Sequence, residues 1–432
     1  MVFRSILLLF VVFLATSCKG PPKGIERIPA TGEKRKQPEV TTPNEGDQTS
    51  KSPAFHPSSQ TLSFSDPVDD GRHIRATWVT HHVFEAKGFD PNATAKNLAA
   101  AGFNTIYVAV YASGKPKWAS AAYKAAGGVA ERSEPLFAFV EALRQEKLHV
   151  AAWFEYGLAL YPLNHPIALA HPSWLQQTVG GATQGNEPQR FLSPSHPEVH
   201  SLMAAMVTEL AEFELFNEIQ LDRLRYTRNS SEGREFGYEA VALQKFKNQT
   251  NTTLTPTKDD AAWVRFREKE VNAIVKTCYD AIKKVSPHIL VSIAPVGHYG
   301  IRQHLQRWTD WIIEESIDSI TIQVYNTDIN AFKGHLDRQI NELNAAQSVS
   351  FKSRLVIGLR AHDSDDATQT QASLEYMSTH GLHNVSLWAY HQFNPPSFGI
   401  DDDLFVLKAQ TKKSWNTVPA HPFIRFTRSG DP

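Results

Sequence analysis

Cysteine is scarce in this chain, which has only Cys18 and Cys278 among its 432 residues. Cys278 lies in a predicted helix with Val275 and Ile282, surroundings typical of an unreactive core thiol. We expect Cys18 to carry a lipid, so that no intramolecular disulfide can form. The folded part must therefore be stabilised by the burial of apolar side chains alone.

An excess of charge of one sign is also missing. The sequence has 44 Lys and Arg residues against 45 Asp and Glu residues, which gives a net charge of -1. The only short basic run lies within residues 33–36, so nothing favours a nucleic-acid partner. With 41% hydrophobic and 21% charged residues, the composition is that of an ordinary soluble globular protein.

Long apolar runs are missing except at the N-terminus. Residues 1–17 combine Arg4, an apolar run over 6–14 and the small residues Ala15-Thr16-Ser17 before Cys18. This pattern predicts a lipoprotein signal peptide, with plain secretion as the alternative. Residues 18–70 are rich in Pro, Ser, Thr, Lys and Glu, which predicts a disordered tether. We therefore expect an extracytoplasmic protein that a lipid anchors to the bacterial cell envelope.

From residue 71 to about residue 400, short β-rich runs alternate with helical ones. The eight expected strands are residues 74–80, 105–111, 149–155, 218–225, 289–296, 319–326, 354–361 and 385–391. Eight repeats of strand and helix predict a single (β/α)8 TIM barrel, followed by a C-terminal extension at 401–432. An open doubly wound sheet is the rival fold. It should carry a Gly-rich phosphate turn after strand one, and the sequence there is His81-His82-Val83-Phe84.

The helical runs have apolar residues on one face. They are expected at 91–101, from 133 onward, 198–213, 259–286, 301–315, 332–346 and 368–380. Two connections are long, at 156–197 and 226–258, and both follow the carboxyl end of a strand. Because that end is the functional face of a TIM barrel, we expect the two insertions to form the walls of a cleft.

Three carboxyl groups stand at strand ends. Asp222 ends an apolar run and is the leading catalytic candidate, with Glu155 or Asp363 as its partner. Glycoside cleavage needs one acid to protonate the leaving oxygen and one carboxylate to attack carbon or activate water. The alternatives are an ion pair of Asp222 with Arg223 or Arg225, a loop contact for Glu155 and a helix cap for Asp363.

Other polar and aromatic side chains at strand ends are candidates for substrate binding. They are His81, Tyr111, Arg225, Tyr226, His298, Gln323, Tyr325, Asn326, Trp388 and His391. We expect no metal, because adjacent His81 and His82 cannot point the same way in an extended strand and the fourth strand offers no Lys. No cofactor is expected.

Several segments together resemble the bacterial glycosyl-hydrolase-like family 10 proteins, which are often lipoproteins. They are Ile-Arg-Ala-Thr-Trp-Val-Thr at 74, Ala-Gly-Phe-Asn-Thr-Ile-Tyr at 101, Ala-Ala-Trp-Phe-Glu at 151, Ile-Gln-Leu-Asp-Arg-Leu-Arg-Tyr at 219, Phe-Gly-Tyr at 236, Val-Ser-Ile-Ala-Pro at 291 and Gln-Val-Tyr at 323. The resemblance implies a barrel that acts on a cell-envelope glycan, peptidoglycan or another polysaccharide. The chain departs from the family pattern at residues 216–218 and at Glu155, where some members have Asn.

The sequence therefore predicts a glycoside hydrolase that uses paired carboxylates. A non-catalytic glycan-binding lipoprotein on the same barrel is the alternative, because a fold does not fix a function. A metal-dependent deacetylase or amidohydrolase is a third reading, and it would need an ion bound by histidines.

Overall fold

The computed structural model describes residues 73–230, 234–361 and 367–393. The predicted signal peptide at 1–17 and the predicted lipid site at Cys18 lie outside the described residues. So do the tether at 18–70, the extension at 401–432 and the predicted catalytic Asp363.

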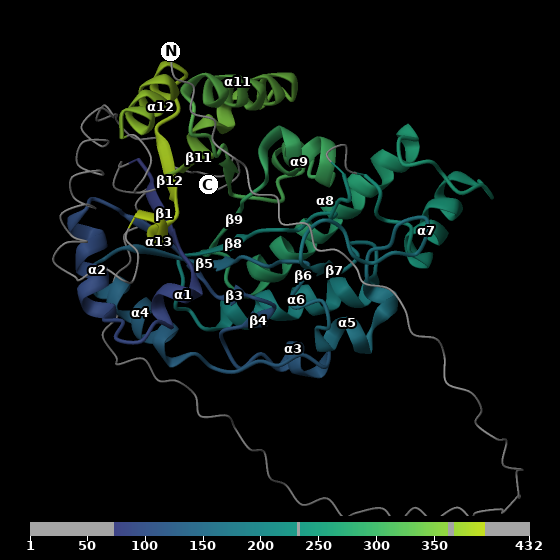
Figure 1. Ribbon diagram of the computed structural model, residues 1–432, viewed down its shortest axis with the longest axis horizontal. Helices are drawn as coiled ribbons and strands as arrows, with labels where there is room; N and C mark the ends of the chain where they lie inside the picture. Colours follow the sequence, from purple (N-terminus) through teal and green to yellow (C-terminus); the bar gives the residue numbers. More distant parts are fainter. Residues whose placement is uncertain (1–72, 231–233, 362–366, 394–432) are drawn as a thin grey trace, which may run out of the picture. The chain divides into compact units, whose positions relative to one another are not determined.

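Eight parallel strands close into a barrel in the order β1-β12-β11-β10-β9-β8-β5-β2, which confirms the predicted fold. The strands are β1 (Arg75–Val79), β2 (Thr105–Ala109), β5 (His149–Phe154), β8 (Glu218–Leu221), β9 (Leu290–Ile293), β10 (Ser319–Gln323), β11 (Leu355–Arg360) and β12 (Asn384–Trp388). Each expected strand is found, although the fourth ends at Leu221 rather than at residue 225. The helices surround the strands, as Figure 1 shows.

Helices connect each barrel strand to the next one along the chain. They are α2 (Pro91–Ala100), α4 (Glu134–Gln145), α6 (Pro197–Glu212), α8 (Ala261–Val285), α9 (Gly297–His304), α10 (Trp308–Ile313), α11 (Ile329–Ala345) and α12 (Ala367–Thr379). Side-chain caps begin three of them, where Asp90, Asp260 and Asp328 accept hydrogen bonds from main-chain N–H groups of the first turn.

The single helix expected at 301–315 is wrong, because α9 and α10 are separate. Leu305 has a left-handed backbone with φ 59° and ends α9. The amide of Gln306 then turns inward, accepts from the main-chain N–H of Val296 at 3.4 Å and donates to the carbonyl of Leu224 at 3.3 Å. The break thus ties this connection to the loop that follows β8.

Short elements follow several strands at the carboxyl end of the barrel. They are the hairpin β3 (Tyr111–Ala112) and β4 (Lys115–Pro116), the hairpin β6 (Ala159–Leu160) and β7 (Arg190–Phe191), the helices α1 (His81–Phe84), α3 (Ala121–Ala125), α5 (Pro166–Ala170) and α13 (Tyr390–Phe393), and the 3-10 turn η1 (Pro172–Trp174). The longer helix α7 (Ala240–Thr250) also follows a strand, β8, whereas the 3-10 turn η2 (Val349–Arg354) directly precedes β11.

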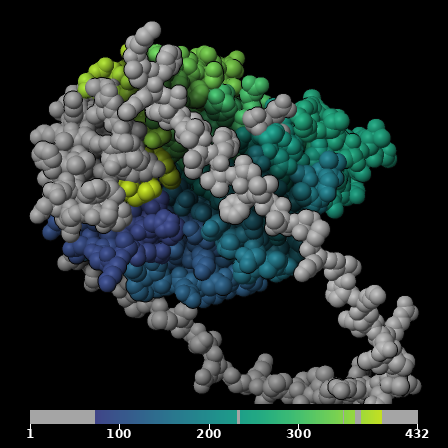
Figure 2. Space-filling view, in the orientation of Figure 1, coloured from purple at the N-terminus to yellow at the C-terminus, as the bar shows by residue number. Residues whose placement is uncertain are grey.

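The two long insertions contact each other through a bridge between Thr178 and Phe236. The second one packs α7 against the start of α8 with its own small apolar cluster, made of Tyr238, Ala242, Phe246, Trp263 and Phe266. The α7 segment projects at the right of Figure 2.

Alternate residues of the strands fill the barrel interior with polar layers. Near the amino ends of the strands, Glu218 contacts His149 at 2.9 Å and accepts a hydrogen bond from Ser292. In the next layer, Gln220 accepts from the indole N–H of Trp78 at 2.7 Å and donates to Thr321 at 3.1 Å. Side chains two residues apart on a strand share a face. Asp222 therefore continues the inward-facing series of Glu218 and Gln220.

Candidate active site

Asp222 directly follows β8 and lies buried above the interior layers. Its Oδ2 accepts a hydrogen bond from the indole Nε1 of Trp153 at 3.3 Å, and its Oδ1 accepts from the main-chain N–H of Arg223 at 2.6 Å. Burial raises the pKa of Asp222 from 3.8 to about 6, although the charges of Arg223 and Arg225 oppose the rise. The group can therefore change its protonation state near neutral pH.

Glu155 follows β5 in the same way and is also buried. Its Oε1 lies 3.9 Å from Nη2 of Arg223, and its buried Oε2 accepts no hydrogen bond from the residues that the structure describes. Burial raises the pKa of Glu155 from 4.5 to about 7; Arg223 lowers it and the charge of Asp222 raises it further. An oxygen without a partner and a raised pKa are properties of a proton donor.

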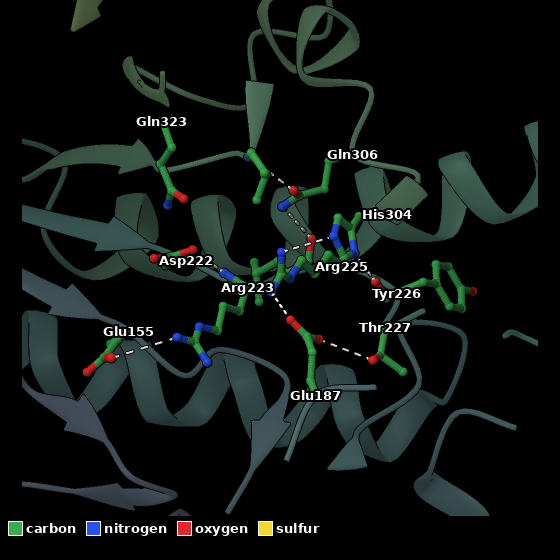
Figure 3. A network of polar contacts seen from close by, with 12 residues as sticks. Glu155, Glu187, Asp222, Arg223, Arg225, Tyr226, Thr227, His304, Gln306 and Gln323 are labelled. Atoms are coloured by element: carbon green, nitrogen blue, oxygen red, sulfur yellow. Dashed lines mark hydrogen bonds and ion pairs between the residues drawn. The ribbon is translucent and has the colours of Figure 1, made fainter. Parts of the chain in front are cut away.

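The two carboxyl groups come from neighbouring strands in matching register. β5 pairs with β8, and the last registered pair is Phe154 with Leu221. Glu155 and Asp222 are the next residue on each strand, and Figure 3 shows both beside Arg223. The structure thus brings together two of the three predicted carboxylates.

The loops that carry these two groups are in direct contact. Gly157 has φ 49°, and a Cβ atom on it would lie 2.0 Å from the main-chain oxygen of Asp222. The main-chain N–H of Leu158 also donates to the carbonyl of Arg223 at 3.4 Å. Only glycine allows this approach, so the spacing of the two carboxyls is built into the backbone.

An aromatic cluster lies next to Asp222. It consists of Trp78, Trp153, Tyr325 and Trp388, whose rings form five contacting pairs with ring centroids 5.5 to 6.4 Å apart. The pKa of Tyr325 is raised by burial and by the charge of Asp222, and its hydroxyl has no hydrogen-bond partner among the described residues. Tyr325 and Trp388, two predicted substrate-binding residues, therefore gather at the leading carboxylate.

Arg225 points away from Glu155 and is held inside the protein. Its Nη2 donates to Glu187 at 2.6 Å, and its Nη1 lies 3.3 Å from Nε2 of His304. The Nδ1 of His304 is 2.7 Å from the carbonyl of Tyr226, so this ring is neutral and Nε2 accepts from Arg225. The guanidinium thus uses both terminal nitrogens within the fold (Figure 3), and its predicted role in substrate binding stays a prediction.

Two tyrosines predicted to bind substrate are packed in the interior. Tyr226 is fully buried, with its hydroxyl 3.5 Å from that of Ser195. Tyr111 is buried with its hydroxyl 3.4 Å from that of Tyr123. β8 ends before residue 226 and Tyr111 begins the β3–β4 hairpin. The predicted role of both residues in substrate binding stays a prediction.

Histidines at the end of β1 and after β12 lie near the same rim. His81 is buried, its Nε2 lies 3.2 Å from the hydroxyl of Ser113, and burial lowers its pKa to about 3. A neutral imidazole in this position can donate or accept a hydrogen bond. The hydroxyl oxygen of Thr80 lies 3.5 Å from Nδ1 of His391.

The remaining predicted residues lie after β9 and β10. Gln323 donates from Nε2 to the carbonyl of Ala294 at 3.1 Å and is drawn above Asp222 in Figure 3. Asn326 contacts His335 at 2.9 Å, and the neutral His298 lies 3.4 Å from the amide of Gln339. Burial lowers the pKa of His298 to about 4. These contacts leave their predicted role in substrate binding a prediction.

Arg223 and Glu187 are site residues that sequence reasoning did not select. Arg223 was visible only as a possible ion-pair partner of Asp222, and its ion pair with Glu155 depends on the register of two strands. Glu187 lies in the insertion 156–197, where no pattern in the sequence marks it. Among the described residues no three His, Cys, Asp or Glu side chains gather as metal ligands, and no helix is long and apolar enough to span a bilayer.

The family described as "Glycosyl hydrolase-like 10" matches residues 73–377, which include every strand of the barrel except β12. The chain is also 26% identical over 217 residues to the glycosyl hydrolase YngK of Bacillus subtilis (strain 168). That match covers 44% of this chain and 39% of the relative, so the chain spans well under half of that protein's length.

Solved structures show the same fold at low sequence identity. The glycoside hydrolase domain of PgaB (BpsB) from Bordetella bronchiseptica has a TM-score of 0.60 and 11% identity, over 80% of this chain and 99% of that one. The catalytic domain of β-amylase from Paenibacillus polymyxa has a TM-score of 0.55 and 13% identity, over 78% and 98% of the two chains.

Proposed function

Since the chain belongs to the glycosyl hydrolase-like 10 family, we propose that it hydrolyses glycosidic bonds in a cell-envelope or extracellular glycan with Glu155 and Asp222. The family match confirms the resemblance read from the sequence, and it supports the predicted class of function, a glycoside hydrolase that acts on a polysaccharide. The single observation that carries the proposal is the register of β5 and β8, which sets two buried carboxyls side by side.

The surroundings of the two carboxyls assign different roles to them. Asp222 accepts two hydrogen bonds, and both favour its ionised form. Glu155 has the higher pKa, about 7 against about 6, and keeps one oxygen without a partner. Environments that push two pKa values apart separate an acid from a base. Glu155 is therefore the proton donor, and Asp222 is the carboxylate that attacks the anomeric carbon or activates the attacking water.

In the first step, Glu155 gives its proton to the glycosidic oxygen as the bond from that oxygen to the anomeric carbon breaks. The positive charge that develops on the sugar ring is stabilised by ionised Asp222, which attacks the carbon or takes a proton from the attacking water. The aromatic cluster of Trp78, Trp153, Tyr325 and Trp388 supplies apolar faces beside the reacting carbon. It also keeps water away from Asp222.

The test is an assay for new reducing ends. Purified protein and its Asp222→Asn and Glu155→Gln variants are incubated with peptidoglycan, with glycan strands stripped of peptides and with common polysaccharides. Each substitution should lower the rate by a factor of about 10² to 10⁴, because each removes a proton-transfer or charge-stabilising group. NMR of the first anomer released decides whether Asp222 attacks the carbon or the water.

Asp280→Asn is the matched control, because Asp280 is a solvent-exposed partner of Lys276 on α8. This variant should retain full activity. Tight glycan binding without any new reducing ends in the unsubstituted protein would instead favour the non-catalytic glycan-binding alternative.

We also propose that the protein is lipid-anchored through Cys18 at the cell envelope, which would place the barrel beside its glycan. The apolar run at 6–14 followed by small residues and a cysteine supports this proposal. Mass spectrometry of the N-terminal peptide should find a diacylglyceryl thioether on Cys18. A Cys18→Ala variant should move to the soluble fraction, and an unmodified thiol in the membrane-bound protein would contradict the proposal.

A further inference from the structure

Arg223 is placed between the two proposed catalytic carboxyls. Its main-chain N–H donates to Asp222 at 2.6 Å, and its guanidinium Nη2 lies 3.9 Å from Glu155. In Figure 3 the side chain extends from the Asp222 end of the loop towards Glu155, while Arg225 turns to Glu187. One residue therefore contacts one carboxyl through its main chain and the other through its side chain.

The backbone fixes this direction. Arg223 has φ 48°, in the left-handed region that residues with side chains rarely adopt. The loop at Gly157 packs against it so closely that a Cβ added at 157 would lie 3.0 Å from the carbonyl carbon of Arg223. A left-handed residue persists only where its surroundings hold it. The guanidinium also lies 4.9 Å from the ring of Tyr156, a cation–π distance that limits its swing.

Three charged groups on two loops face Glu155. They are Arg223 after β8, Asp222 after β8 and Lys117 after β4. Lys117 is already bound by Glu85 at 2.8 Å, whereas Arg223 lies at ion-pair distance from Glu155 without a side-chain hydrogen bond to it. Of the two cations, Arg223 is therefore the one whose charge is directed at Glu155.

We propose that Arg223 is a positioning residue that holds the Glu155 carboxyl beside Asp222 and shares its positive charge between the two groups. The proposal rests on the proposed function for its catalytic meaning, but the arrangement itself can be measured without turnover. Arg223 keeps both carboxyls from becoming protonated together as the site excludes water. It therefore sets the pH range in which one is protonated while the other is ionised.

Removing the charge should raise the pKa of both carboxyls, because Arg223 lowers each of them. The test compares Arg223→Met and Arg223→Lys in protein labelled with ¹³C at the Glu carboxyls, with the Glu155 signal assigned by its loss in Glu155→Gln. In Arg223→Met, the Glu155 titration should move up by about one pH unit. Arg223→Lys should restore part of the shift, because it keeps a charge without the fork geometry.

The pH profile of kcat provides the second readout. Both limbs of a bell-shaped profile should move to higher pH in Arg223→Met, whereas a merely structural residue would lower the rate at every pH without moving the limbs. Arg265→Met is the matched control, since Arg265 is an exposed arginine of α8 that pairs with Glu268 and, at 3.5 Å, with Asp310 on α10. It should leave both the titration and the profile unchanged.

The two proposals fail in different ways. If the unsubstituted protein cleaves no glycan, the proposed function fails, and the Glu155 titration still tests Arg223. If Glu155 titrates at the same pH in folded Arg223→Met as in the unsubstituted protein, the role of Arg223 is overturned even where hydrolysis is found. Circular dichroism and the melting temperature establish that the variants are folded.

Discussion

Gly157 lies against the main chain of Asp222 so closely that a Cβ atom at 157 would be 2.0 Å from the Asp222 carbonyl oxygen. The contact joins the loop after β5 to the loop after β8. Each loop carries one of the two buried carboxyls, so the packing of this glycine determines how far apart Glu155 and Asp222 lie.

Replacing Gly157 with alanine should therefore damage the site and the fold together. The positive φ and the clash with backbone cost about 2 to 4 kcal/mol of unfolding free energy. Displacement of Asp222 should lower kcat about a hundredfold. Urea denaturation and the reducing-end assay measure the two effects.

Gly181→Ala is the control for this substitution. Gly181 also has a positive φ, 81°, but a Cβ atom there meets nothing within 4 Å. It should cost about 1 kcal/mol and leave kcat unchanged. Equal losses in the two variants would mean that the contact with Asp222 has no special part in the site.

The fold and one half of the site could be predicted from the chain, because both depend on local patterns. Alternating apolar strands and helices predict the barrel, and polar residues at strand ends predict its functional rim. Asp222 and Glu155 were selected in this way, since each lies at the end of an expected strand. The parity of Glu218, Gln220 and Asp222 on β8 was equally readable.

Contacts between distant loops could not be predicted from the chain. The pairing of Arg225 with Glu187 joins residues from two loops, and nothing in the local sequence marks either as the partner of the other. Tyr226 was expected at the rim because the strand was expected to run to residue 225, but β8 ends at Leu221, Arg223 has a left-handed backbone and Tyr226 is buried. Long-range packing decided both cases.

The raised pKa of Asp222 predicts that the active site costs stability at high pH. A carboxyl whose pKa is higher in the folded state than the unfolded value contributes stability below about pH 4, and this contribution is lost as the pH rises through about 6. The loss at pH 8 is on the order of 3 kcal/mol for Asp222. Glu155 acts in the same direction through about pH 7.

Asp222→Asn should therefore raise the melting temperature at pH 8, by the equivalent of about 1 to 2 kcal/mol, and leave it similar or lower at pH 4. The gain is smaller than the full charge effect because the amide cannot accept both present hydrogen bonds. Calorimetry from pH 4 to 8 measures it. A variant less stable than the unsubstituted protein at pH 8 would argue against a strained carboxylate.

Substitutions in the interior layer around Gln220 should lower the free energy of unfolding as much as substitutions in a hydrophobic core. Gln220→Leu removes the acceptor of the Trp78 indole and the donor to Thr321, both of which are fully buried. The cost should be about 2 to 4 kcal/mol, since two buried polar groups lose a partner. Gln145→Leu, at an exposed glutamine of α4, should change the urea midpoint little.

Breaking the ion pair of Arg225 and Glu187 tests whether Arg225 stabilises the loop or binds substrate. Glu187→Gln removes the negative charge that pairs with the buried guanidinium and leaves it only neutral hydrogen-bond acceptors there, the new amide oxygen and His304, which should cost about 2 to 4 kcal/mol. Glu198→Gln, at an exposed partner of His196, should cost less than about 0.5 kcal/mol. If Arg225 only holds the loop, KM per folded molecule stays unchanged in Glu187→Gln while the urea midpoint falls. A rise in KM with unchanged stability would instead indicate that Arg225 binds the glycan, because without Glu187 the guanidinium would no longer be held in the position from which it contacts the substrate.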